Sequence, residues 1–374
     1  MTKAMERAVS GKLLGRSQLE DLVVVPVFAF VAALVLGALV MAATGVDLAT
    51  IGTSYVALVR GSVGSINAVS ETLTAAAPLV LAGLGLALGF RAGLFNIGAE
   101  GQVIMGGLAA VVAGVALGDM PAIIALPGAV LAGALAGAFY ASIAGWLRAV
   151  TGAHEVISTI MLNLISYRLL DYLLRTPLIQ KEGRADPISK AVPDSAELPQ
   201  LLAFLDPNLR VHAGIFLTLA MVALAYWLLF RSKLGFEFRA SGENAVAARF
   251  AGMNASLTII LAMAIAGAMA GLAGANQVLG VLDRATPGFS AGIGFNAIAV
   301  ALMGRSHPVG VLFAGVLFGA LEAGGRQMQV DAGVSIDLIA IIQSLIIVFI
   351  AAPLLVRAIF PWGFRRERTG EGGS

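Results

Sequence analysis

The residues of this chain that could bind a solute lie inside or beside long apolar runs. The densest polar stretch is residues 90–102, where an arginine, a carboxylate and two amides accompany three glycines. Charged groups inside a membrane span are costly and usually face a cavity or a protein partner. One interpretation places the stretch beside a translocation pathway, with Asn96, Glu100 and Gln102 supplying hydrogen-bonding groups. The other places Arg91 and Glu100 at the membrane surface and lets the amides link helices, and for Glu100 we expect this structural role.

A second polar stripe lies in the apolar run 156–174. Asn163, Tyr167 and Asp171 recur every four residues, so they share one helix face, which should turn toward the bundle interior or a pore. For Glu155, just before this run, we expect a first-turn helix acid rather than a proton carrier. Amides suit neutral polar solutes because each offers both donors and an acceptor. The candidate pathway residues are therefore four amides, namely Asn96, Asn163, Asn276 and Asn296.

The same inventory excludes several kinds of catalytic site. The sequence holds no cysteine and three histidines, which rules out a disulfide, a thiol nucleophile and a histidine cluster. Its one Gly-Lys pair, Gly11 and Lys12, precedes a leucine and lacks the upstream glycine of a phosphate-binding loop. We therefore expect no metal, no cofactor and no enzymatic activity in this chain, which must take energy from elsewhere.

The composition requires most of the chain to lie in a membrane. Of its 374 residues, 59% are hydrophobic and 12% are charged, whereas soluble domains carry about 25% charged residues. Apolar runs without strict alternation favour helices over a transmembrane barrel, so we expect an all-α polytopic membrane protein. Glycine is abundant, and GxxxG spacings predict tight helix crossings at Gly85/Gly89, Gly133/Gly137, Gly267/Gly271 and Gly315/Gly319.

The hydropathy pattern predicts about ten membrane-spanning helices in a single transmembrane domain, residues 1–374. Spans eight and nine are short, which is typical of helices that are interrupted or cross only partly. In chain order the expected spans are 22–44, 72–90, 97–117, 122–147, 156–174, 211–230, 257–282, 291–303, 309–321 and 335–359.

The first span follows a basic leader, residues 1–21. At about 23 residues the run 22–44 is too long for the core of a signal peptide, so we expect an uncleaved span. The alternative is a signal peptide that is cleaved near Met41–Ala43.

Charge asymmetry predicts the orientation of the spans. Ten spans place both termini on one side, and fifteen of the 24 lysines and arginines fall on that side, against eight on the other. Because positive loops stay in the cytoplasm, we expect a cytoplasmic leader 1–21 and a cytoplasmic tail 360–374. The polar segment 175–210 is then extracytoplasmic, and the stretch 234–254 is cytoplasmic.

The stretch 234–254 is short, charged and helix-like between two apolar runs. Ser241 can cap a helix start, Glu243 then lies in the first turn, and Arg249 falls in the last turn. Gly252 stands where a left-handed C-terminal cap is wanted. These signals predict one helix of about ten residues, which we interpret as a handle for a soluble motor protein.

A weak internal repeat links the two halves of the chain. Residues 94–98 and 294–298 both place Phe-Asn beside small residues and both lead into a Met-Gly pair. Spans 2–5 and 7–10 would run in opposite directions, and inverted repeats with interrupted helices are typical of transporters. Chance similarity in a sequence rich in glycine and alanine is the alternative.

Three motifs resemble those of a known protein family, and they occur in the order in which the family has them. Residues 93–102 resemble a hallmark of permease subunits of ABC-type importers, in the superfamily that contains ribose and branched-chain amino-acid permeases. Residues 155–163 are similar to the form found in its nucleoside and simple-sugar branch. Residues 240–252 are similar to the cytoplasmic loop that docks into the ATPase. The leader and the segment after span five resemble the longer of the paired nucleoside permeases.

The resemblance implies a type II-like permease in a bacterial inner membrane. Two permeases, identical or paralogous, would form the pore, and each would carry a cytoplasmic ABC ATPase that uses ATP and magnesium. An extracytoplasmic solute-binding protein or lipoprotein would deliver the solute, membrane lipid would surround the spans, and no nucleic acid is involved. The resemblance assigns ATPase coupling to Ala240, Gly242, Glu243, Asn244, Ala247, Ala248 and Gly252.

Several alternatives stay open at this stage. A nucleoside is the expected solute, and a simple sugar or a branched-chain amino acid would suit the same fold. An ion-coupled secondary transporter would need no ATPase. A structural or sensory membrane protein would need no pathway at all.

Overall fold

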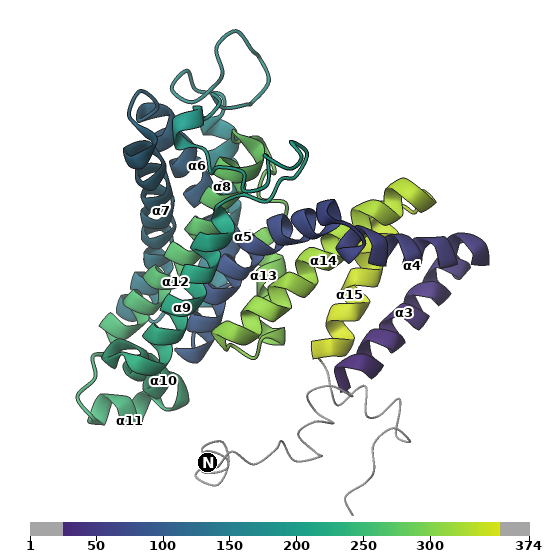
Figure 1. Ribbon diagram of the computed structural model, residues 1–374. Helices are drawn as coiled ribbons and strands as arrows, with labels where there is room; N and C mark the ends of the chain where they lie inside the picture. Colours follow the sequence, from purple (N-terminus) through teal and green to yellow (C-terminus); the bar gives the residue numbers. More distant parts are fainter. Residues whose placement is uncertain (1–24, 352–374) are drawn as a thin grey trace, which may run out of the picture. The chain divides into compact units, whose positions relative to one another are not determined.

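The computed structural model describes residues 25–351, and in this range it is helical, with two isolated bridges and no extended strand (Figure 1). The helices are α3 (Val25–Ala43), α4 (Leu48–Val63), α5 (Ile66–Arg91), α6 (Ala99–Ala116), α7 (Ala122–Thr151), α8 (Glu155–Leu173), η2 (Asp194–Ala196), α9 (Gly214–Arg231), α10 (Lys233–Glu243), α11 (Ala245–Phe250), α12 (Ala255–Gln277), η3 (Val278–Leu282), α13 (Ile293–Met303), α14 (Pro308–Ala332) and α15 (Ile336–Ala351). The predicted leader 1–21 and tail 360–374 lie outside the described residues.

Within the described residues, seven helices are long and apolar enough to cross a membrane: α5, α6, α7, α8, α9, α12 with η3, and α14. This confirms the predicted all-α polytopic class. Span eight corresponds to α13, which is short, as predicted. The first and the last predicted spans correspond to α3 and α15, and the predicted bounds of both extend beyond the described residues.

Two helices differ from the predicted spans. Helix α4 was not among the predicted spans, because serine, threonine and Arg60 lower its hydropathy. The predicted ninth span stops at Leu321, whereas α14 continues to Ala332. Arg326, one of the polar residues beyond the predicted end, forms an ion pair with Glu71 of α5 at 3.5 Å.

The described chain divides into two compact units. Among the described residues, the smaller unit joins 25–56 with 328–351, and in it α3 packs against α15. The larger unit, residues 57–327, holds the motifs of interest.

Helix α12 is central to the larger unit, where it packs against α5, α6 and α7. A β-carbon on Gly137 of α7 would lie 2.7 Å from the α-carbon of Gly271, and one on Gly106 of α6 would overlap the Gly271 backbone. These approaches confirm the tight crossing that the spacings Gly133/Gly137 and Gly267/Gly271 predict, because only glycine lets three helix backbones come so close.

The two halves of the larger unit pack reciprocally. Helix α5 of the first half lies against α13 of the second, and α12 of the second half lies against α6 of the first. Such an exchange of partners is what two halves related as an inverted repeat would show.

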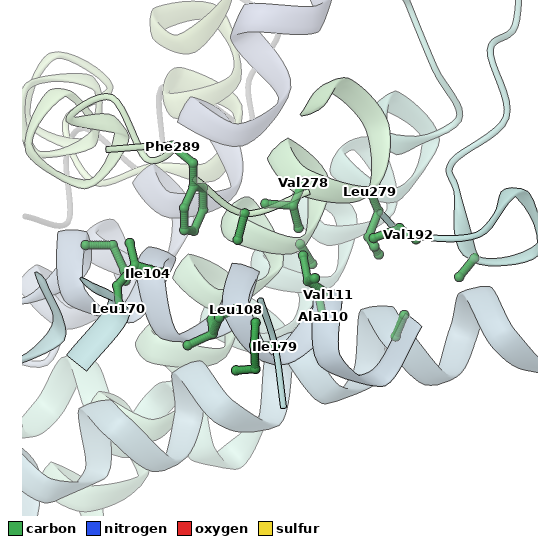
Figure 2. Close-up of a cluster of buried hydrophobic side chains, with 14 of the residues drawn as sticks. Ile104, Leu108, Ala110, Val111, Leu170, Ile179, Val192, Val278, Leu279 and Phe289 are labelled. Atoms are coloured by element: carbon green, nitrogen blue, oxygen red, sulfur yellow. The ribbon is translucent and has the colours of Figure 1, made fainter. Parts of the chain in front are cut away.

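The segment between α8 and α9 covers one end of the larger unit, the end opposite α10 and α11 (Figure 1). It is tied down by backbone hydrogen bonds, in which Val192 donates to the Asp283 carbonyl at 2.7 Å and Leu198 donates to the Leu279 carbonyl at 2.8 Å. Figure 2 shows that Val192 and Leu279 belong to one apolar cluster with Val111 of α6. The segment therefore closes its end of the bundle as a packed cover.

Candidate functional site: a joint between two helix starts and its helical handle

The polar stretch 90–102 runs from the end of α5 through a link, residues 92–98, into the first turn of α6. Asn96 is buried in this link, where its Nδ2 donates to Gln102 Oε1 at 2.9 Å and its Oδ1 accepts from Gln102 Nε2 at 3.0 Å. The same Oδ1 accepts from the Gly98 backbone N–H at 3.0 Å. Both polar atoms of the Asn96 amide thus take part in shaping the start of α6.

Asn163 of α8 is also buried and engaged. Its Nδ2 donates to the Ile97 carbonyl at 2.9 Å, and its Oδ1 accepts from the Gly101 backbone N–H at 2.8 Å. These bonds fasten α8 to the start of α6. In this conformation the first two amides of the predicted pathway hold the structure together rather than face a solute.

Glu100 joins the start of α6 to the start of α13. Its side chain is 0% exposed. One carboxylate oxygen accepts from the Ser290 hydroxyl at 2.6 Å and the Tyr167 hydroxyl at 3.2 Å, and the other accepts from the Gly294 backbone N–H at 2.8 Å. A buried charge needs such partners, and the positive ends of two helices stabilise it further. We call this contact between the two helix starts the Glu100 joint.

The joint is close-packed as well as charged. A β-carbon on Gly294 would overlap the backbone of Glu100, so the first turn of α13 rests directly on the first turn of α6. The repeated motifs 94–98 and 294–298 therefore meet in space, although Asn96 precedes its helix and Asn296 lies within α13.

The other two predicted amides have different surroundings. Asn276 of α12 is buried, and neither of its amide atoms has a hydrogen-bond partner among the described residues. Beside it is His212, whose Nδ1 accepts from the Gly214 backbone N–H at 3.2 Å, while its ring packs against Gly214 and Gly280. Asn296, by contrast, is exposed in the first turn of α13.

The stretch 234–254 forms two helices, and the prediction of one helix capped by Ser241 is wrong. Ser232 caps α10 by accepting from the Gly235 N–H at 3.0 Å, and Asn244 caps α11 by accepting from the Ala247 N–H at 2.9 Å. Ser241 lies inside α10.

For the three other residues singled out in this stretch, one predicted position is wrong and two are confirmed. Glu243 ends α10 rather than opening a helix. Arg249 is in the last turn of α11, as predicted. Gly252 has a left-handed φ of 84°, which confirms the predicted C-terminal cap.

Phe238 anchors this pair of helices and was not among the predicted site residues. Its side chain is fully buried in a cluster with residues of α5, α7, α9 and α12, among them Leu88, Ala144, Leu229 and Met263. The four-residue spacing of Leu234 and Phe238 on one helix face could have indicated the anchor.

Gly242 at the end of α10 rests on the link between α5 and α6. A β-carbon there would overlap the Arg91 carbonyl oxygen and lie 2.9 Å from the Gly93 nitrogen. Gly93 has a left-handed φ of 72°, which favours glycine. The end of α10 therefore contacts the turn that leads into the Glu100 joint.

Two charged contacts hold the rest of this link. Arg91 Nε donates to the Ser306 carbonyl at 3.0 Å, which ties the end of α5 to the turn between α13 and α14. Glu155 forms an ion pair with Arg148 and accepts from the Phe95 N–H at 3.4 Å. Glu155 is the first residue of α8, as predicted.

Beyond these contacts, α11 is mostly open. Phe250 is 90% exposed and Val246 is also exposed, whereas Ala248 is buried against the bundle. Ala240 is half-buried, and Ala247 and Asn244 are exposed. Within residues 25–351, no group of three or more His, Cys, Asp or Glu side chains is placed to hold a metal ion.

Residues 68–351 match the family described as the branched-chain amino acid transport system permease component. The chain belongs to this family. This permease is 38% identical to the guanosine ABC transporter permease of Bacillus subtilis, over 90% of its own chain and 94% of the relative. It is 37% identical to a glucose ABC transporter permease of Haloferax volcanii, over 92% and 89%, and 32% identical to a nucleoside ABC transporter permease of Lactococcus lactis, over 91% and 93%. No solved structure gives a significant match.

Family membership confirms the resemblance found in the sequence. The chain is a pore-forming permease of an ABC importer, a transport subunit rather than an enzyme. It lies in a membrane, and the alternatives of an ion-coupled secondary transporter and of a structural or sensory protein are not favoured.

The surroundings of His212 predict a pH dependence of stability. Burial, and then the nearby Arg210 charge, lower the pKa of His212 from 6.5 to about 4. The unfolded chain therefore binds this proton first, so the contribution of His212 to stability is fully present above about pH 6.5 and is lost as the pH falls toward 4. Between pH 7.5 and 5.0 we expect a loss of about 2 kcal/mol from this group.

Thermal unfolding of the purified permease at these two pH values measures the effect. His212→Gln should show a smaller drop in midpoint than the wild type. His154→Gln serves as the control, since His154 is 67% exposed, and it should keep the wild-type dependence. An unchanged pH dependence in His212→Gln would contradict the assignment.

Proposed function

We propose that this permease imports nucleosides. The observation that carries the solute assignment is the similarity, over nine-tenths of both chains, to permeases named for guanosine and for nucleosides. A glucose permease of comparable identity makes a simple sugar the second candidate. None of these three relatives is named for an amino acid, so a branched-chain amino acid ranks last.

The permease is proposed to work with three kinds of partner. A cytoplasmic ABC ATPase would bind ATP and magnesium, and an extracytoplasmic binding protein or lipoprotein would deliver the solute. A second permease would complete the pore. Two guanosine permeases of Bacillus subtilis match this chain, at 38% and 29% identity, and the second match covers only 68% of it. This supports a longer and a shorter paralogue as the pair.

The charge asymmetry supports a bacterial inner-membrane location with both termini in the cytoplasm. In this orientation α10 and α11 face the cytoplasm, and the cover between α8 and α9 faces outward. The two lie at opposite ends of the larger unit (Figure 1), as the topology requires.

The α10–α11 pair is proposed as the coupling element. Its exposed Val246 and Phe250 offer an apolar surface to the ATPase, while buried Phe238 fixes α10 in the bundle. A push or pull on α11 would then reach the Arg91–Gly93 turn through Gly242, because the two backbones are in contact. From that turn the motion would pass along the link to the Glu100 joint.

The four candidate amides are proposed to divide into two roles. Asn96 and Asn163 would set the shape of the link, since their side-chain amides bond to residues in the link and in the first turn of α6. Asn296 would contact the solute, because it is exposed beside the joint. Asn276 is buried in this conformation and would meet a solute only if α12 moved away from the cover.

The solute assignment is tested by uptake into proteoliposomes that hold the complete complex with its binding protein. Guanosine, glucose and leucine are offered separately, and ATP is supplied on the side of the membrane where the ATPase lies. We expect ATP-dependent uptake of guanosine and none of leucine. Uptake of glucose without guanosine would replace the nucleoside by a sugar, and leucine uptake alone would contradict the proposal.

The coupling role is tested by Gly242→Val in the same vesicles. A valine at this position must displace the Arg91–Gly93 turn, so ATP hydrolysis should continue while guanosine uptake falls at least tenfold. Gly52→Val is the matched control, because a β-carbon at Gly52 would have no neighbour within 4 Å. Full transport by the Gly242 variant would count against the docking role.

A further inference from the structure

The first turn of α13 presents an aromatic ring and an amide next to each other. Phe295 is 44% exposed, and Asn296 is exposed beside it, whereas Gly294 and Ala297 on either side are buried. The open side of this turn therefore carries two groups that can hold a flat polar molecule.

The depth of this turn argues against a lipid contact for Asn296. Asn296 lies seven residues before α13 ends at Met303, next to the turn that Arg91 holds. This is a rise of about 10 Å, roughly a third of the hydrocarbon core. An amide that faces lipid at this depth would lose its hydrogen bonds at considerable cost. Polar side chains at such depths face a water-filled pathway or protein.

The first half of the chain does not repeat this arrangement. Phe95 is 40% exposed, but Asn96 is buried and paired with Gln102. Of the two Phe-Asn motifs, only Phe295 and Asn296 therefore leave both a ring and an amide accessible. They do so directly beside the Glu100 joint, because Gly294 is part of it.

We propose that Phe295 stacks on the base of the nucleoside during passage and that Asn296 hydrogen-bonds to the edge of that base. This inference rests on the proposed function. An aromatic ring can stack on the face of any base, and the stacking contact is stronger for a base with a larger face. An amide offers a donor and an acceptor to a base edge. The larger purine ring should depend on Phe295 more than a pyrimidine does.

The test measures kcat/KM for uptake of guanosine and of uridine in proteoliposomes with the complete complex. Phe295→Leu should lower the guanosine value at least tenfold and the uridine value by less than threefold, so the preference between the two solutes changes. Phe295→Tyr keeps the ring and should restore the wild-type preference. Phe139→Leu is the matched control, since Phe139 of α7 is a 71% exposed phenylalanine, and it should behave as wild type.

An equal loss for both nucleosides would overturn the proposal, because it would indicate a general packing role. The proposal would also be overturned if Phe295→Leu failed to assemble with its partner subunits and Phe295→Tyr regained assembly but not the wild-type preference. Phe295 would then be a residue of the subunit interface. If the leucine variant does not insert, Asn296→Ser takes its place and should raise the KM for guanosine, and an unchanged KM would overturn the proposal. Absence of nucleoside uptake by the wild type would instead contradict the proposed function itself.

Discussion

The buried carboxylate of Glu100 is the interaction on which the larger unit depends. A charge with no exposed surface is costly unless it is fully hydrogen-bonded. Here Ser290, Tyr167 and the Gly294 N–H supply the donors, and two helix starts supply favourable dipoles. Removing any one element would leave the charge short of a partner, so α6, α8 and α13 are held at a common point. The first turns of α6 and α13, one from each half of the chain, therefore meet at one joint.

The α10–α11 pair is connected to this joint through the link between α5 and α6. Phe238 is buried among four other helices, so α10 is part of the bundle rather than a loose loop. Gly242 meets the link where the chain turns toward α6. A soluble ATPase could therefore move the helix starts through backbone contacts, without any contact of its own inside the membrane. The inferred base contact at Phe295 lies next to the same joint, which would place solute recognition and coupling within a few residues of each other.

Local sequence rules predicted the parts of this account that depend on local chemistry. Hydropathy placed most spans, and glycine predicted the left-handed cap at Gly252. The rules failed where tertiary packing decides. Ser232 and Ser241 are equally good caps by type, and the burial of Phe238 selects the first because it sets where α10 begins. Asn96 was predicted as a pathway residue, and its part in shaping the link could not be predicted from local sequence, since its partner Gln102 faces it only after the chain has turned.

Hydrogen–deuterium exchange of the reconstituted complex, with and without ATP, tests the central claim most directly. If the Glu100 joint transmits the motion of the handle, residues 92–102 and 290–296 should change protection together when ATP binds. In Glu100→Gln the two segments should respond separately, because the charged partner of Gly294 and Ser290 is lost. A response confined to residues 233–254 in the wild type would contradict the account.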